Sequence, residues 1–134
     1  DLNHPKSWER ALPAALELTN ALDADLHLVT VVPNIEMPLV GTFLPDDFEK
    51  QALKKAGEDL HDFAVKNIPE GVRGKSHVAH GNVRDEIVKA ADTLGCDLIV
   101  MAPHRRGIQE MLVGPITEYV ARHANQSVLI VHDD

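Results

Sequence analysis

Two short apolar runs near the end of the chain define its clearest pattern. Residues 98–101 and 128–131 are continuous in apolar side chains, and each run is too short for a helix. An amphipathic stretch that starts at Gly114-Pro115 lies between them. Buried parallel strands that are joined through a helix have this pattern. The last third of the chain is therefore predicted to be strand, loop, helix and strand.

The rest of the chain alternates in the same way. Strands are predicted at 25–33, where Pro33 ends the run, and at 72–79. Helices are predicted at 8–22 with Ser7 as N-cap, at 45–67, and at 83–94 with Asn82 as N-cap and Gly95 after the end. An apolar loop at 34–44 is predicted to cover the ligand edge of the sheet. This alternation indicates an α/β fold with a parallel sheet wrapped by helices.

Composition limits the possible classes of protein. The chain has 134 residues, which we interpret as one domain spanning 1–134, with 44% hydrophobic and 25% charged residues. The net charge of -8 argues against a nucleic-acid binder or a membrane-surface binder, because both need a basic face. No apolar run is long enough for a membrane span. The single Cys96 fits a reducing compartment, and a cytoplasmic location is predicted.

The candidate chemistry lies after the run at 98–101, because open α/β sheets bind ligands beyond the carboxyl ends of their strands. Arg105 and Arg106 are fixed positive charges suited to phosphate. Gly114 allows close approach of the backbone, while Pro115 suits the first position of a helix but has no N–H. Backbone N–H groups at such a helix start bind anions. The alternative is an ordinary helix start with solvated loop arginines.

The segment 96–131 resembles the C-terminal half of universal stress proteins. Nucleotide-binding members carry Gly-x-x-Gly, about nine residues, and Gly-Ser or Gly-Thr before a helix and a last strand. Here Ala102-Pro103-His104-Arg105 stands in place of Gly-x-x-Gly, and Gly114-Pro115 stands in place of Gly-Ser. Both loop glycines and the hydroxyl are absent. The chain is similar to a subgroup with a shortened loop, in which a small residue, any residue and His-Arg precede eight residues and Gly-Ser.

The resemblance implies an open, doubly wound parallel sheet of five strands, of the adenine nucleotide alpha hydrolase-like type with strand order 3-2-1-4-5. The first strand of that fold is missing from the sequence, so we expect about eight residues to precede Asp1. In that frame Asp1 takes the place of the family's aspartate at the tip of strand one. The alternative for Asp1 is a turn-forming or capping acid.

The resemblance also implies a function, namely stress-response regulation through bound ATP, or ADP or AMP, with Mg²⁺ or Mn²⁺ bridging the phosphates. The implied nucleotide-binding residues are Asp1, Val31, Met101, Ala102, His104, Arg105, Arg106, Gly114, Pro115, Ile116 and Thr117. The alternative is a nucleotide-free universal stress protein that acts through protein–protein contacts. No catalytic motif and no protein metal site is predicted, so any ATP hydrolysis would be slow and incidental.

The last predicted strand, 127–131, is short, apolar and terminal in the sequence. Such a strand is expected at a sheet edge, where its backbone can pair with another chain. Members of the family commonly dimerise in this way, so a homodimer through this strand is predicted. The alternative is an edge that is covered within a monomer.

Overall fold

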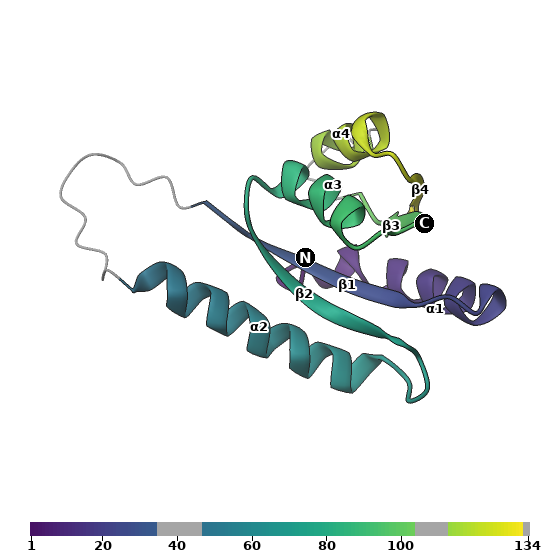
Figure 1. The fold of residues 1–134 in the computed structure, drawn as a ribbon, viewed down its shortest axis with the longest axis horizontal. Helices are drawn as coiled ribbons and strands as arrows, with labels where there is room; N and C mark the ends of the chain where they lie inside the picture. The colour runs from purple at the N-terminus through teal and green to yellow at the C-terminus, as the bar shows by residue number, and fades with distance from the viewer. Residues whose placement is uncertain (35–46, 104–112, 133–134) are drawn as a thin grey trace.

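The computed structural model describes residues 1–34, 47–103 and 113–132 of the chain. Helices and strands alternate along it, as the colour gradient in Figure 1 shows. The elements are a 3₁₀ turn η1 (Pro5–Ser7), α1 (Ala11–Leu22), β1 (Leu26–Pro33), α2 (Phe48–Asn67), β2 (Gly74–Gly81), α3 (Val83–Thr93), β3 (Leu98–Met101), α4 (Pro115–His123) and β4 (Ser127–Ile130). The predicted α/β class is confirmed.

The four strands form two parallel pairs. β1 pairs with β2 over eight positions, from Leu26 opposite Gly74 to Pro33 opposite Gly81. β3 pairs with β4 over four positions, starting with Leu98 opposite Ser127. Among the described residues neither pair hydrogen-bonds to the other, so the predicted single sheet of order 3-2-1-4-5 is not observed. The structure instead has two two-stranded sheets, because no described strand joins β1 or β2 to β3 or β4.

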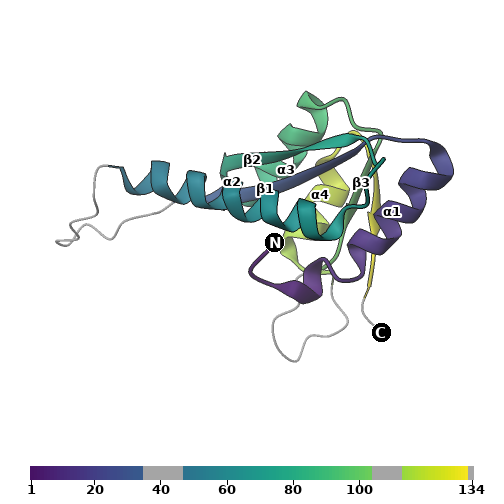
Figure 2. The same cartoon turned by 90° about the horizontal axis from the view of Figure 1, so that it is seen from below.

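Helices cover both faces of the β1–β2 pair (Figure 1; Figure 2 gives the view from below). On β2, Val78 faces α2, where its side chain lies 3.9 Å from the position that a Cβ on Gly57 would take. Gly81 faces α3, where it lies against Glu86. Successive strand residues alternate between faces, so even positions of β2 face α2 and odd positions face α3. α4 packs on α3 and β4, while α1 contacts both β1 and β3.

The first helix starts later than predicted. α1 begins at Ala11, not at residue 8, and Ser7 is not its N-cap, because its hydroxyl donates to the carbonyl of His4 at 2.7 Å. Pro13 explains the late start. A proline has no N–H to donate, which a helix tolerates only in its first turn. With Ala11 first, Pro13 is the third helical residue. Trp8 then packs its ring edge-on against that of Phe63, with the ring centres 4.8 Å apart.

The end of α2 and the start of α3 lie where the sequence predicts them, while β2 is shifted. α2 ends at Asn67 and α3 begins after Asn82, as predicted, and Gly95 has the left-handed φ of 65° expected after a helix end. The strand predicted at 72–79 is two residues out of place, because pairing with β1 starts only at Gly74. None of the helices in the described ranges is both long and apolar enough to cross a membrane.

Candidate functional site

The start of α4 has the backbone expected of an anion site. Gly114 is the N-cap, with φ 78° and ψ 151°, and Pro115 is the first helical residue. Glycine has no side chain that could accept a hydrogen bond from the first turn, and Pro115 has no N–H. The backbone N–H groups of Ile116 and Thr117 are therefore the donors at this terminus that no N-cap side chain satisfies. They lie where the helix dipole favours negative charge.

The Thr117 side chain faces the interior. Thr117 is 2% exposed, and Val120, one turn further along α4, is fully buried. The methyl and hydroxyl groups of Thr117 therefore lie on the buried side of the helix. Ile116 is half-buried and Pro115 is exposed. The contribution of Thr117 to a ligand would thus come from its backbone N–H.

The end of β3 provides the second part of the predicted site. Met101 is the last residue of the strand and lies opposite Ile130, and its carbonyl accepts a hydrogen bond from the Val131 N–H at 2.9 Å. Ala102 follows and is half-buried, and Pro103 is buried. The next three predicted residues, His104, Arg105 and Arg106, lie outside the described residues, as do positions 35–44 of the cover loop predicted at 34–44. Their roles stay predictions.

Val31 belongs to the other strand pair. It lies opposite Ala79, two residues before the end of β1, on the face that α3 covers. Among the described residues no hydrogen bond joins Val31 to Met101 or to Gly114. The predicted nucleotide-binding residues therefore come from the ends of two strands, β1 and β3, that belong to different strand pairs.

Asp1 has the contacts of a turn-forming acid. Its carboxylate accepts a hydrogen bond from the backbone N–H of Asn3 at 3.0 Å and pairs with Nδ1 of His4 at 2.6 Å. Its carbonyl accepts from the hydroxyl of Ser7 at 3.1 Å. These bonds shape the turn that leads into η1, which is the alternative role that the sequence left open.

The start of α3 differs from that of α4, because its own side chains occupy it. The Asn82 side chain accepts a hydrogen bond from the Asp85 N–H at 3.4 Å, as predicted for an N-cap. Gly81 has φ 146°, and a Cβ there would lie 2.8 Å from Oε1 of Glu86. The positive φ favours glycine at this position. Two acids in the first turn, Asp85 and Glu86, already provide the negative charge that the dipole favours.

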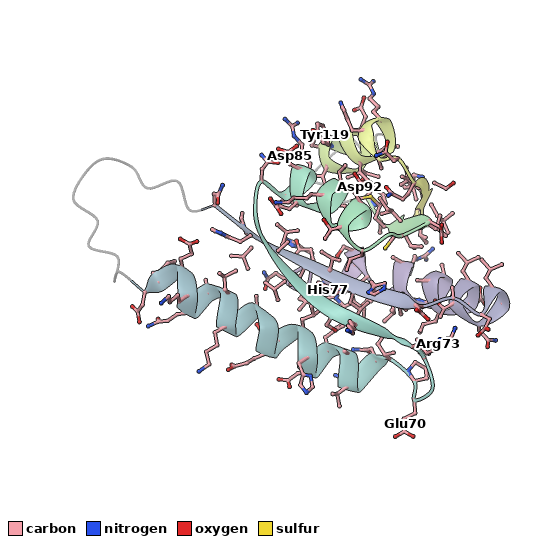
Figure 3. All side chains as sticks on the ribbon, in the orientation of Figure 1. Glu70, Arg73, His77, Asp85, Asp92 and Tyr119 are labelled. Carbon is pink, nitrogen blue, oxygen red and sulfur yellow. The ribbon has the colours of Figure 1, made fainter. Side chains whose placement is uncertain are left out.

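A cluster of side chains holds α4 against α3 (Figure 3). The Arg84 guanidinium lies 4.4 Å from the centre of the Tyr119 ring. The His123 ring stacks on the same tyrosine, with the ring centres 4.0 Å apart. A hydrogen bond with Asp85 raises the pKa of the Tyr119 hydroxyl. These contacts fix the position of the α4 N-terminus relative to α3.

Two histidine contacts were missed by reasoning from the sequence. His80, near the end of β2, pairs with Glu49 at the start of α2 at 3.0 Å, and His27 pairs with His77 across β1 and β2. The alternation of β2 could place His80 on a face but not name its partner. In the described ranges no group of three or more His, Cys, Asp or Glu residues could hold a metal ion.

Comparison with known proteins agrees with this architecture. Residues 2–132 match the model of the universal stress protein family. Universal stress protein G of Shigella flexneri is 33% identical over 111 residues, which are 81% of this chain and 78% of that protein.

Two solved structures with related folds contain a nucleotide. A universal stress protein in complex with cAMP superposes with a TM-score of 0.66 and 22% identity, over 92% of this chain and 88% of that one. A universal stress protein family member from Arabidopsis thaliana with AMP bound superposes with a TM-score of 0.62 and 21% identity, over 96% and 78%. From its sequence and its fold, this chain belongs to the universal stress protein family.

Proposed function

We propose that this protein is a regulatory universal stress protein that binds ATP or another adenine nucleotide at the carboxyl ends of its strands. The observation that carries the proposal is the start of α4. Its first turn offers the N–H groups of Ile116 and Thr117, and Gly114 at the N-cap leaves them open to a ligand. A phosphate would accept both hydrogen bonds and interact favourably with the helix dipole.

Two further observations support an adenine nucleotide as the ligand. The related structures with cAMP and with AMP share the fold of this chain and hold ligands of that class. In addition, Arg105 and Arg106 fall in the segment of the sequence that connects β3 to α4, and their fixed positive charges suit a phosphate. Mg²⁺ or Mn²⁺ would be held mainly by the phosphates and water, since a protein cluster is not needed for such a site.

We further propose that the two strand pairs are halves of one sheet of order 3-2-1-4-5, with a fifth strand between β1 and β3. α1 supports this arrangement because it packs on both β1 and β3. A strand there would bring the ends of β1 and β3 into one ligand edge, as in other doubly wound sheets. A homodimer through β4 and a cytoplasmic location complete the proposal. The protein would act by binding and not as an enzyme.

A nucleotide-free interaction protein is the second candidate. Pro115 removes one N–H from the helix start, the Thr117 side chain is buried, and the Asp1 carboxylate already bonds to Asn3 and His4. Each of these features reduces the number of groups left for a nucleotide. In this case the protein would act through its dimer and partner surfaces alone.

Calorimetric titration with ATP, ADP, AMP and cAMP, with and without Mg²⁺, tests the proposal directly. The variant is Arg105→Ala, and the matched control is Arg73→Ala, since Arg73 is an exposed arginine that pairs with Asp25 at 2.8 Å at the amino-terminal end of β1 and β2. Loss of one hydrogen-bonded charge contact is expected to weaken ATP binding about tenfold. The control is expected to bind as the wild type does.

Two results would contradict the nucleotide proposal. The first is the absence of heat and of any thermal shift at millimolar ATP in a protein that unfolds cooperatively. The second is an equal loss of affinity in Arg105→Ala and Arg73→Ala, which would indicate nonspecific attraction between charges. Sedimentation of the same nucleotide-free sample as a dimer would then favour the interaction protein.

A further inference from the structure

His27 and His77 face each other across the first strand pair. Nδ1 of His27 lies 2.9 Å from Nε2 of His77, and the ring centres are 5.1 Å apart. The two nitrogens therefore point at each other, which is the geometry of an N–H···N hydrogen bond. It is not the geometry of a metal site, where the lone pairs converge on a third point. One ring donates and the other must accept, so at least one imidazole is neutral.

The pair lies at the amino-terminal end of β1 and β2. His27 is opposite Lys75 and His77 is opposite Val29, so the contact runs diagonally between the first residue pairs of β1 and β2. His77 is visible on β2 in Figure 3. The backbone bond from the Leu26 N–H to the Arg73 carbonyl, at 2.7 Å, closes the same end. The candidate nucleotide site is at the opposite end of the strands.

The charges around the pair do not favour a second proton. Lys75 shares its face of the sheet, being in register with His27, while Asp25, two residues before His27, is paired with Arg73 at 2.8 Å. Partial burial, together with the positive charges of His27 and Lys75, lowers the pKa of His77.

The helices that pack on these strands supply no compensating carboxylate. On α3, Glu86 lies at Gly81, at the far end of β2, and the Asp92 carboxylate accepts from the side chains of Asn125 and Gln126. The remaining charged residues of α3 are Arg84 and Asp85, which contact Tyr119, and Lys89, which is exposed.

The other two helices leave this face of the strand pair without an acid. α2 covers the opposite face, where Glu49 pairs with His80. Glu17 of α1 is exposed, away from the buried positions Ala11, Ala15 and Thr19.

We propose that the His27–His77 hydrogen bond is a proton-sensitive latch that holds the start of β1 against β2 at neutral pH and releases it in acid. When both imidazoles are protonated, neither of the two facing nitrogens can accept, so the hydrogen bond is lost. The second proton also places two imidazolium charges beside Lys75. Because folding lowers the pKa of His77, its stabilising contribution is fully present above the ordinary histidine value of about 6.5 and is lost as the pH falls below it.

A double-mutant cycle on the whole chain tests the latch. The free energy of unfolding is measured at pH 7.5 and pH 5.0 for the wild type, His27→Gln, His77→Gln and the double variant. The control is His61→Gln, which removes an exposed histidine of α2. We expect a favourable coupling between positions 27 and 77 at pH 7.5 that disappears at pH 5.0. The wild type is expected to lose more stability on acidification than His77→Gln does, and His61→Gln to follow the wild type.

Two measurements on the wild type do not depend on the variants folding. In a histidine-resolved NMR titration, His77 is expected to titrate below the ordinary histidine value. Hydrogen exchange is expected to show the Leu26 amide losing protection at pH 5.0 after correction for the intrinsic exchange rate. A normal or raised pKa of His77, or a coupling energy that is equal at both pH values, would overturn the proposal.

Discussion

The starts of α3 and α4 are two solutions to the same problem. Each helix follows a strand and leaves N–H groups without an intrahelical partner. At α3 the Asn82 side chain accepts one of them, and two acids follow in the first turn. At α4 the N-cap is Gly114, and the single acid of the first turn, Glu118, is paired with Arg122.

The difference bears on where the proposed ligand would bind. The α3 terminus is satisfied by residues of the chain itself, so an added anion would meet carboxylates. The α4 terminus lacks a side-chain cap, and the negative charge nearest to it is neutralised. In a family whose members include nucleotide-bound structures, the open terminus is the one expected to hold phosphate.

The largest effect is expected at Gly114. Its φ of 78° and ψ of 151° lie in a region that only glycine occupies without strain. Gly114→Ala should lower the free energy of unfolding by about 1–3 kcal/mol. The matched control is Gly57→Ala in α2, where the new Cβ meets Val78 at an ordinary 3.9 Å and should stabilise the helix by roughly 0.5–1 kcal/mol. Urea unfolding measures both, and equal signs would contradict the assignment of strain to Gly114.

Pro115→Ser tests the open terminus by adding the missing donor. The new backbone N–H would give a phosphate one further hydrogen bond, worth about 1.5 kcal/mol to a charged group. Nucleotide affinity measured by calorimetry should rise about tenfold. Pro13→Ser, which changes a first-turn proline of α1, should leave that affinity unchanged. An unaltered affinity in Pro115→Ser would argue that phosphate does not bind at this helix start.

The smallest effect is expected at Asn82. Its hydrogen bond is long, at 3.4 Å, so Asn82→Ala should cost about 0.5–1 kcal/mol of stability, at the lower end for an N-cap. Asn82→Asp keeps an acceptor and should stay close to the wild type in thermal unfolding. Nucleotide binding should be the same in all three proteins. A parallel loss of affinity in Asn82→Ala would mean that α3, and not only α4, belongs to the ligand site.

Much of the fold was predictable because its signals are local. The strand at Leu98–Met101, the helix start at Gly114–Pro115 and the cap at Asn82 each depend on neighbouring residues. The late start of α1 was missed, although Pro13 was visible in the sequence. A helix tolerates a proline only in its first turn, so a helix that contains Pro13 cannot start at residue 8.

The candidate site was predictable only in part. The position of Gly114 and the lack of an N–H at Pro115 follow from residue type. The inward direction of the Thr117 side chain does not, since it depends on which face of α4 meets α3 and β4. The turn made by Asp1 also depends on where His4 folds back.

By itself, the sequence determined the order and type of the elements, the family, and the residues at the starts of α3 and α4. Hydrophobic periodicity and capping chemistry act over a few residues, so they can be read without a structure. Only the tertiary structure decided which distant side chains meet, such as His27 with His77 and His80 with Glu49. Those contacts depend on strand register and helix docking, where a shift of one residue would turn every side chain to the opposite face.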